Sequence, residues 1–140
     1  MTPKILLRIA SVVMFVHGVL HTIGFTSWKT DPDKQNVIKA MNGPRFPFMG
    51  SSRNIADFYD GFGYASSIAL LLIAVSLWVI SDDANNGSSL AKKMTATLAV
   101  ILVLWGADEI IYFFPLAAGM SWLSAICAFG AYFASDKQKA

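Results

Sequence analysis

The chain has 140 residues, of which 55% are hydrophobic and only 14% are charged, and its formal net charge is +2. Soluble domains are usually about 25% charged, so this chain has too few charges to cover the surface of a water-soluble protein. The small net charge, without a basic cluster that contains aromatic residues, argues against nucleic-acid binding.

Four apolar segments, at residues 5–25, 58–80, 94–114 and 116–134, predict helices that cross a membrane. Each is close to the ~20 residues that a helix needs to span the hydrocarbon core. The first segment is similar to a secretory signal, but no small-residue cleavage site follows it, so we expect it to be retained. These features predict an all-α integral membrane protein, with one domain over residues 1–140 that folds as an antiparallel bundle of four transmembrane helices.

The longest connection, residues 26–57, is expected to contain a short helix. Asp31 suits the N-cap, Pro32 suits the first helical position, and "NGP" at residues 42–44 is a strong stop signal. A short helix of this kind can lie in the membrane interface, beside the aromatic segment "RFPFMG".

The other two connections are predicted to be turns. "SDDANNGSSLAKK", residues 81–93, is typical of a polar turn, and "FPLAAGM", residues 114–120, of a tight apolar turn in which Pro115 ends the third helix. The single cysteine, Cys127, cannot form an internal disulfide and is expected to be a buried, inert thiol.

The positions of the basic residues favour an orientation with both termini in the cytoplasm. The two sides of the membrane carry nearly equal numbers of basic residues. The expected cytoplasmic residues lie on short segments next to the spans, whereas most of the extracytoplasmic ones lie in the long loop beside acidic residues. The expected cytoplasmic set is Lys4, Arg8, Lys92, Lys93, Lys137 and Lys139, and the extracytoplasmic set is Lys29, Lys34, Lys39, Arg45 and Arg53.

Ionisable residues gather in the outer half of this predicted bundle. His17 and His21, in "HGVLHTIGF", are four residues apart and share one helix face. Asp108 and Glu109, in "WGADEIIYFF", lie past the middle of the third span. A charged side chain at the centre of a span costs about 2.5–3.5 kcal/mol on insertion scales, so unpaired charges are rare there and mark candidate functional sites. We therefore expect the histidines to face acids across the bundle.

Further polar and aromatic residues border this group. Asp57, Asp60 and Tyr64 form a polar stripe at the start of the second span, in "NIADFYDGFGY". Asp57 also has a purely structural explanation, because Asn54 and Asp57 resemble a capping box.

The primary hypothesis is an outward-facing pocket for a small apolar or lipid-like molecule, with histidines and acids at its polar end. A His–carboxylate pair can also shuttle a proton, so an enzymatic role stays open. The expected aromatic walls are Trp28, Tyr59, Phe62, Tyr64, Trp105 and Tyr112. The candidate site residues are His17, His21, Asp108, Glu109, Asp57, Asp60, Tyr64, Trp105 and Tyr112.

Two alternatives are of other classes. A divalent metal ion held by His17, His21, Asp108 and Glu109 would make the protein a metal-dependent membrane enzyme, although the spacing lacks the glutamate of HExxH. A His–acid cluster that only fixes helix register would make it a structural or partner-binding protein. Haem is disfavoured, because the two histidines share one helix face and axial ligands approach from opposite sides. The oligomeric state is left open, a homo-oligomer included.

Two segments, "HGVLHTIGF" followed by Trp28 and "FPFMGSSRNIADFYDGFGYASS", resemble a family of small four-pass bacterial membrane proteins of unknown function. The resemblance covers the first two spans and their loop, and it implies this topology and a bacterial inner membrane without a catalytic assignment. A likeness of architecture alone is to the emopamil-binding and sigma-2 receptor group, whose small helical bundles use buried acids in a sterol pocket. No residue motif is shared with that group, so no site residues are carried over from it.

Overall fold

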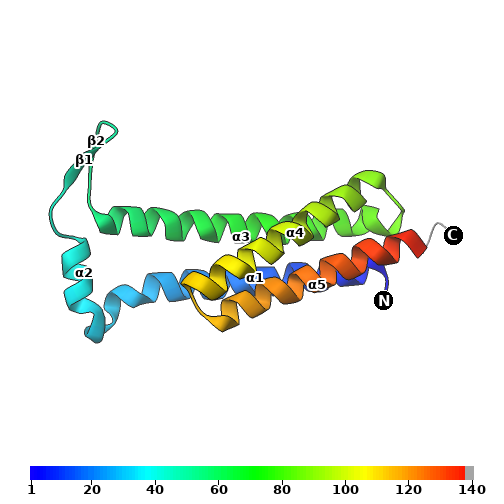
Figure 1. Ribbon diagram of the computed structural model, residues 1–140, viewed down its shortest axis with the longest axis horizontal. Helices are drawn as coiled ribbons and strands as arrows, with labels where there is room; N and C mark the ends of the chain where they lie inside the picture. The colour runs from blue at the N-terminus through cyan, green and yellow to red at the C-terminus, as the bar shows by residue number, and fades with distance from the viewer. Residues whose placement is uncertain (138–140) are drawn as a thin grey trace. The chain divides into compact units, whose positions relative to one another are not determined.

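The computed structural model describes the backbone of residues 1–137 and the side chains of residues 1–135. It is helical apart from one short hairpin, which confirms the all-α prediction (Figure 1). Four helices are long and apolar enough to cross a membrane, as predicted: α1, α3, α4 and α5. The elements are α1 (Pro3–Ser27), η1 (Trp28–Thr30), η2 (Pro32–Lys34), α2 (Gln35–Met41), β1 (Phe46–Phe48), β2 (Ser51–Arg53), α3 (Ile55–Asn85), α4 (Ser89–Tyr112) and α5 (Pro115–Lys137).

Contacts divide the chain into two compact units, and α1 and α3 contribute to both. The first, here the core unit, combines Met1–His17 with the chain from Leu70 onward. The second, here the loop unit, is Gly18–Ala69.

The core unit is built on small side chains. One buried apolar cluster draws on α1, α3, α4 and α5, and alanines supply much of it, among them Ala10, Ala74, Ala99 and Ala128. Small residues let helix backbones approach closely, and hydroxyl groups can then bond across the gap. The Ser11 hydroxyl donates to the Ala74 carbonyl at 2.7 Å.

The turn between α3 and α4 is shorter than predicted. Most of "SDDANNGSSLAKK" is helical, and only residues 86–88 separate the two helices. Polar side chains do not by themselves end a helix, whereas Gly87, at φ +73°, adopts the left-handed conformation that does. Ser88 then caps α4 by accepting a hydrogen bond from the Ala91 N–H.

The connection between α4 and α5 is tight and apolar, as predicted, but it is shorter than "FPLAAGM": residues 115–120 belong to α5, and only residues 113 and 114 separate the two helices. Pro115 also has a different role from the one predicted. The α4 helix ends at Tyr112, where the Phe113 N–H still donates to the Glu109 carbonyl at 2.9 Å. Pro115 is the first residue of α5, a position at which its missing N–H has no helical partner to lose. The two helices are therefore neighbours joined by a very short connection (Figure 1).

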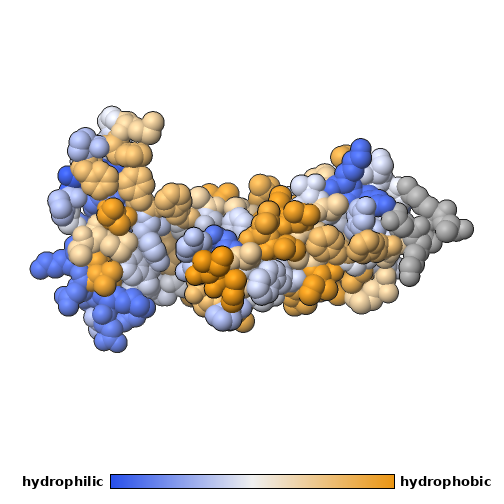
Figure 2. Space-filling model, in the orientation of Figure 1, coloured by the Kyte–Doolittle hydropathy of each residue, from blue (hydrophilic) through white to orange (hydrophobic). Residues whose placement is uncertain are grey.

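Large apolar side chains face outward on all four long helices. Figure 2 shows hydrophobic residues over the visible faces of α4 and α5, whereas hydrophilic residues gather at the segment around α2. The outward side chains include Phe15, Val19, Leu72, Val79, Leu104, Ile111, Ile126 and Phe133. Apolar side chains on this scale are more than a water-soluble monomer normally exposes.

In the loop unit, the predicted short helix is present. The Asp31 carboxylate accepts the Asp33 N–H at 3.0 Å, Pro32 is the first residue of η2, and α2 ends at Met41, directly before the "NGP" stop. Two hydrogen bonds lower the pKa of Asp31 below its usual value. The larger effect comes from the Lys34 ammonium, at 2.7 Å, and the smaller from the Asp33 N–H. This cap therefore stays charged at neutral pH.

The aromatic segment after α2 forms a hairpin that the sequence did not predict. Strand β1 pairs antiparallel with β2, and Met49 and Gly50 form the turn with φ values of +46° and +81°. The Phe48 ring contacts Phe58 of α3 with centroids 5.0 Å apart. The hairpin thereby packs against the first turn of α3.

Candidate functional site

Four side chains of the core unit form a buried polar group, here called the Glu109 cluster: His17, Trp105, Glu109 and Ser121. His17 Nε2 lies 3.0 Å from Glu109 Oε1, and the Trp105 indole N–H donates to the same oxygen at 2.9 Å. The Ser121 hydroxyl donates to Glu109 Oε2 at 2.6 Å. One carboxylate thus accepts hydrogen bonds from α1, α4 and α5.

The Glu109 cluster is almost closed to solvent. The exposed fraction is 4% for His17, 5% for Glu109 and 0% for Ser121. The second ring nitrogen of His17, Nδ1, lies 3.5 Å from the Ser121 hydroxyl oxygen. Because both carboxylate oxygens and both ring nitrogens face protein groups, the cluster can stabilise a buried acid without a bound ligand.

A second group occupies the loop unit and is here called the loop-end cluster: His21, Phe25, Trp28, Lys29, Tyr59, Asp60 and Tyr64. Its aromatic rings contact one another between α1, η1 and α3. Phe25 meets Tyr64 edge-on with centroids 4.9 Å apart, and Trp28 meets Tyr59 at 4.7 Å. The His21 ring stacks on Phe25 at 5.9 Å, and its Nε2 lies 3.3 Å from the Gly63 carbonyl oxygen, which can only accept a hydrogen bond from the ring N–H.

Two polar atoms of the loop-end cluster are buried without a partner among the described residues: Trp28 Nε1 and Asp60 Oδ1. The two residues and their sequence neighbours make two contacts between η1 and α3. Lys29 binds Asp60 Oδ2 at 2.5 Å, and the Trp28 ring packs on Tyr59. One is a donor and the other an acceptor, and a buried polar group left unpaired costs about 1–3 kcal/mol. A partner for Trp28 Nε1 would have to accept a hydrogen bond, and a partner for Asp60 Oδ1 would have to donate one.

The predicted site residues therefore separate into different environments. His17, Glu109 and Trp105 meet in the Glu109 cluster, whereas His21, Asp60 and Tyr64 lie in the loop-end cluster. Asp108 and Tyr112 are on exposed faces of α4.

Asp57 fills the structural role that the capping-box pattern predicted. Its carboxylate accepts the Asn54 N–H at 3.1 Å, while the Asn54 side chain accepts the Asp57 N–H at 2.8 Å. Arg45 adds a contact to the same carboxylate at 3.3 Å. The Asp57 carboxylate is thus engaged by Asn54 and Arg45 at the start of α3.

The four residues of the metal hypothesis are not assembled. Within the described residues, no three His, Cys, Asp or Glu side chains come together in a way that could hold a metal ion. His17 and Glu109 bond each other directly, and Asp108 points to the surface, since adjacent helical residues face about 100° apart.

Ser121 and Lys29 were not among the predicted site residues. Ser121 belongs to a stripe of small residues on α5 that continues through Ser124, Ala125 and Ala128, all of them buried. A serine on such a stripe is a signal of a close helix contact with a hydroxyl available for bonding. For Lys29 the sequence predicts only a place in the extracytoplasmic loop.

Comparisons with known proteins do not assign either cluster. No family model, no curated protein and no solved structure matches the chain.

Proposed function

We propose that the protein is a multi-pass membrane protein that binds a small lipid-like molecule at the loop-end cluster. The observation that carries the proposal is the buried pair of unpartnered atoms, Trp28 Nε1 and Asp60 Oδ1. The same cluster contains two aromatic ring pairs, Trp28–Tyr59 and Phe25–Tyr64, which would supply the apolar contacts that such a molecule needs.

The chemistry of the pair narrows the ligand. A hydroxyl group accepts a hydrogen bond from an indole N–H and donates one to a carboxylate, whereas an ether or ester can only accept. The proposed ligand is therefore an amphiphile that carries a hydroxyl group at its polar end. With the termini in the cytoplasm, as the basic residues predict, the loop-end cluster would lie at the outer face of a bacterial inner membrane.

The Glu109 cluster favours a second, structural role. Its hydrogen bonds are made within the protein, and they join three of the four long helices. We infer that this cluster sets the register of α1, α4 and α5, while ligand binding takes place at the loop-end cluster. Proton transfer from this pair to a substrate would need a conformation in which the substrate reaches His17 or Glu109.

The test uses 1-tetradecanol and its methyl ether as probes, with the protein in a hydroxyl-free detergent such as an amine oxide. A ligand that binds the folded state raises the melting temperature by an amount that grows with the logarithm of its concentration relative to Kd. We expect the alcohol to raise the melting temperature and the ether to leave it unchanged. The alcohol effect should disappear in Trp28→Phe, which keeps an aromatic ring but lacks the indole donor. It should persist in the control Trp122→Phe, because the Trp122 indole N–H donates to the Val103 carbonyl and lies outside the loop-end cluster.

The opposite results are equally informative. Equal shifts with the alcohol and the ether would show that the chain contact, and not the Trp28–Asp60 pair, drives binding. If neither probe nor a total membrane lipid extract shifts melting, a bridging water molecule suffices for the pair and the structural role alone remains.

A further inference from the structure

The core unit has an apolar groove between α1 and α3. Its volume is about 350 Å³, and it is lined by Ser11, Val12, Phe15, Ala74, Val75 and Trp78. Four of these side chains face outward, with exposed fractions from 46% for Trp78 to 53% for Phe15. The Ser11 hydroxyl donates its hydrogen bond to the Ala74 carbonyl, so the groove presents an apolar surface to a bound molecule.

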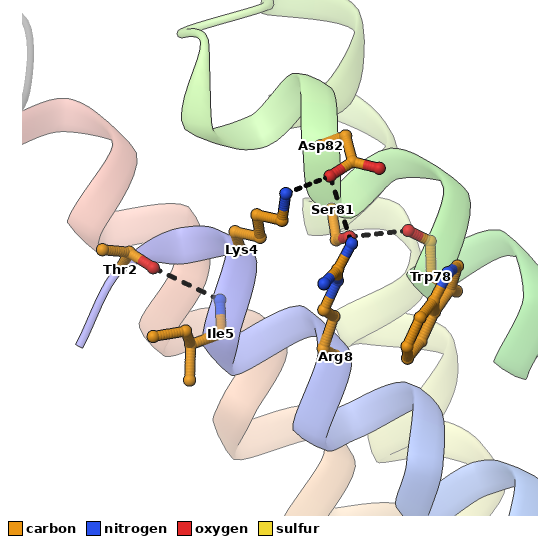
Figure 3. Close-up of polar contacts among 7 residues, drawn as sticks. All are labelled: Thr2, Lys4, Ile5, Arg8, Trp78, Ser81 and Asp82. Carbon is orange, nitrogen blue, oxygen red and sulfur yellow. Dashed lines mark hydrogen bonds and ion pairs between the residues drawn. The ribbon is translucent and has the colours of Figure 1, made fainter.

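One end of the groove carries positive charge. The Arg8 guanidinium lies over the Trp78 ring, 4.6 Å from its centroid, and reaches Asp82 at 3.3 Å and Ser81 at 3.4 Å. Lys4 reaches the same Asp82 oxygen at 2.5 Å. Figure 3 shows both cations converging on Asp82, with the Trp78 ring beside Arg8.

Two cations share one carboxylate at this end, which leaves one positive charge in excess. Arg8 has five N–H donors, of which contacts within the described residues use two. Lys4 has three N–H donors, of which such contacts use one. Both cations remain more than a third exposed, at 38% each, so an anion can approach them.

The groove and the charged end lie in line along α1. Phe15 is seven residues beyond Arg8, which corresponds to about 10 Å along a helix. Lys4 and Arg8 stand near one end of a candidate membrane span, whereas Phe15 lies farther into it. A molecule with an anionic head and an apolar chain would match this order of groups.

We propose that the groove holds one acidic phospholipid, with its phosphate at Lys4 and Arg8 and an acyl chain along Val12, Phe15 and Val75. The excess positive charge discriminates against a zwitterionic lipid, whose own amine opposes these cations. Membrane-proximal basic residues attract acidic lipids by roughly fivefold each. The proposal shares with the proposed function only the membrane assignment, because the loop-end cluster takes no part in it.

The experiment is native mass spectrometry of the protein equilibrated with equimolar phosphatidylglycerol and phosphatidylcholine of identical acyl chains. We expect a single retained lipid, with phosphatidylglycerol enriched over phosphatidylcholine by about fivefold or more. Arg8→Gln and, independently, Lys4→Gln should each lower the enrichment about fivefold. Val12→Trp, which fills the groove without changing charge, should reduce retention of both lipids.

Two matched controls separate a site from a diffuse attraction. Lys93→Gln removes an exposed positive charge of α4, and Val16→Trp adds the same bulk one turn farther along α1, on a residue that does not line the groove. Both should retain the lipid as the unmodified protein does. A loss of enrichment in Lys93→Gln equal to that in Arg8→Gln, or full retention in Val12→Trp, would overturn the proposal.

Discussion

At the scale of single residues, Glu109 shows how a carboxylate can be held in an apolar helix assembly. Three donors from different positions converge on its two oxygens: the His17 imidazole, the Trp105 indole and the Ser121 hydroxyl. Removing one partner of a buried pair leaves the other without compensation, whereas replacing both by apolar groups can be nearly neutral. The two kinds of substitution should therefore differ sharply in cost.

We expect His17→Leu and Glu109→Leu each to lower the free energy of unfolding by about 3–5 kcal/mol. The double variant should recover much of that loss, because it buries neither an unpaired acid nor an unpaired imidazole. The measurement is a double-mutant cycle from unfolding titrations of the purified protein.

The control for this cycle is His21→Leu, one turn along the same helix. His21 makes one long bond to the Gly63 carbonyl, which also accepts a hydrogen bond from Ser67 at 3.0 Å. Its removal should cost no more than about 1 kcal/mol. If His17→Leu proves as mild as His21→Leu, the Glu109 cluster does not hold the helices together.

At the scale of elements, two glycines two positions apart in α3 have different surroundings. A Cβ at Gly61 would meet nothing within 4 Å, whereas a Cβ at Gly63 would overlap the Phe25 ring. Phe25 is only 7% exposed, so its ring has little room to move aside. The two positions provide a matched test of how closely α1 approaches α3 in the loop unit.

Gly61→Ala should raise the free energy of unfolding by about 0.5–1 kcal/mol, since alanine is the better helix former. Gly63→Ala gains the same helix propensity but forces the Phe25 ring to move, at a typical cost of about 1–3 kcal/mol. We therefore expect opposite signs for the two changes in melting temperature. Equal stabilisation by both would mean that Phe25 is not packed on Gly63.

The sequence was informative about the elements and less so about their ends. Runs of apolar residues located all four long helices, and the Asp31, Pro32 and "NGP" signals located the short one. The α3 helix nevertheless extends to Asn85, since polar residues continue a helix that already has a partner to pack on. The β1–β2 hairpin escaped prediction, because its turn requires Met49 at positive φ, a conformation rare for a non-glycine residue.

At the scale of the whole molecule, the predicted orientation can be tested by accessibility. With Cys127→Ala as background, Lys39→Cys places a thiol on α2 and Asn86→Cys places one in the α3–α4 turn. An impermeant maleimide added to intact cells should label Lys39→Cys, and it should label Asn86→Cys only after the membrane is opened. The reverse pattern would invert the topology and place the loop-end cluster at the cytoplasmic face.

The pairing of candidate residues across helices could be predicted only in part. The cost of a charge in a span led to the expectation that a histidine meets an acid, and the structure confirms this for His17 and Glu109. The rotation of α4 about its axis decides whether Asp108 or Glu109 meets the histidine. The apolar residues of α4 are spread too evenly around the helix to predict that rotation. The structure turns Glu109 inward and Asp108 outward, and it places Ser121 where the second carboxylate oxygen, Oε2, needs a donor.

The short α4–α5 connection has a consequence for how the chain is made. The ribosome adds His17 to the chain long before it adds Glu109. During this interval the imidazole of His17 has no carboxylate partner from α4. When α4 emerges, α5 follows after only two residues, and the pair can enter the bilayer as one hairpin. That hairpin carries Trp105 and Ser121 together with Glu109, so in a membrane-inserted chain the acid would enter the bilayer with two of its three hydrogen-bond donors already beside it.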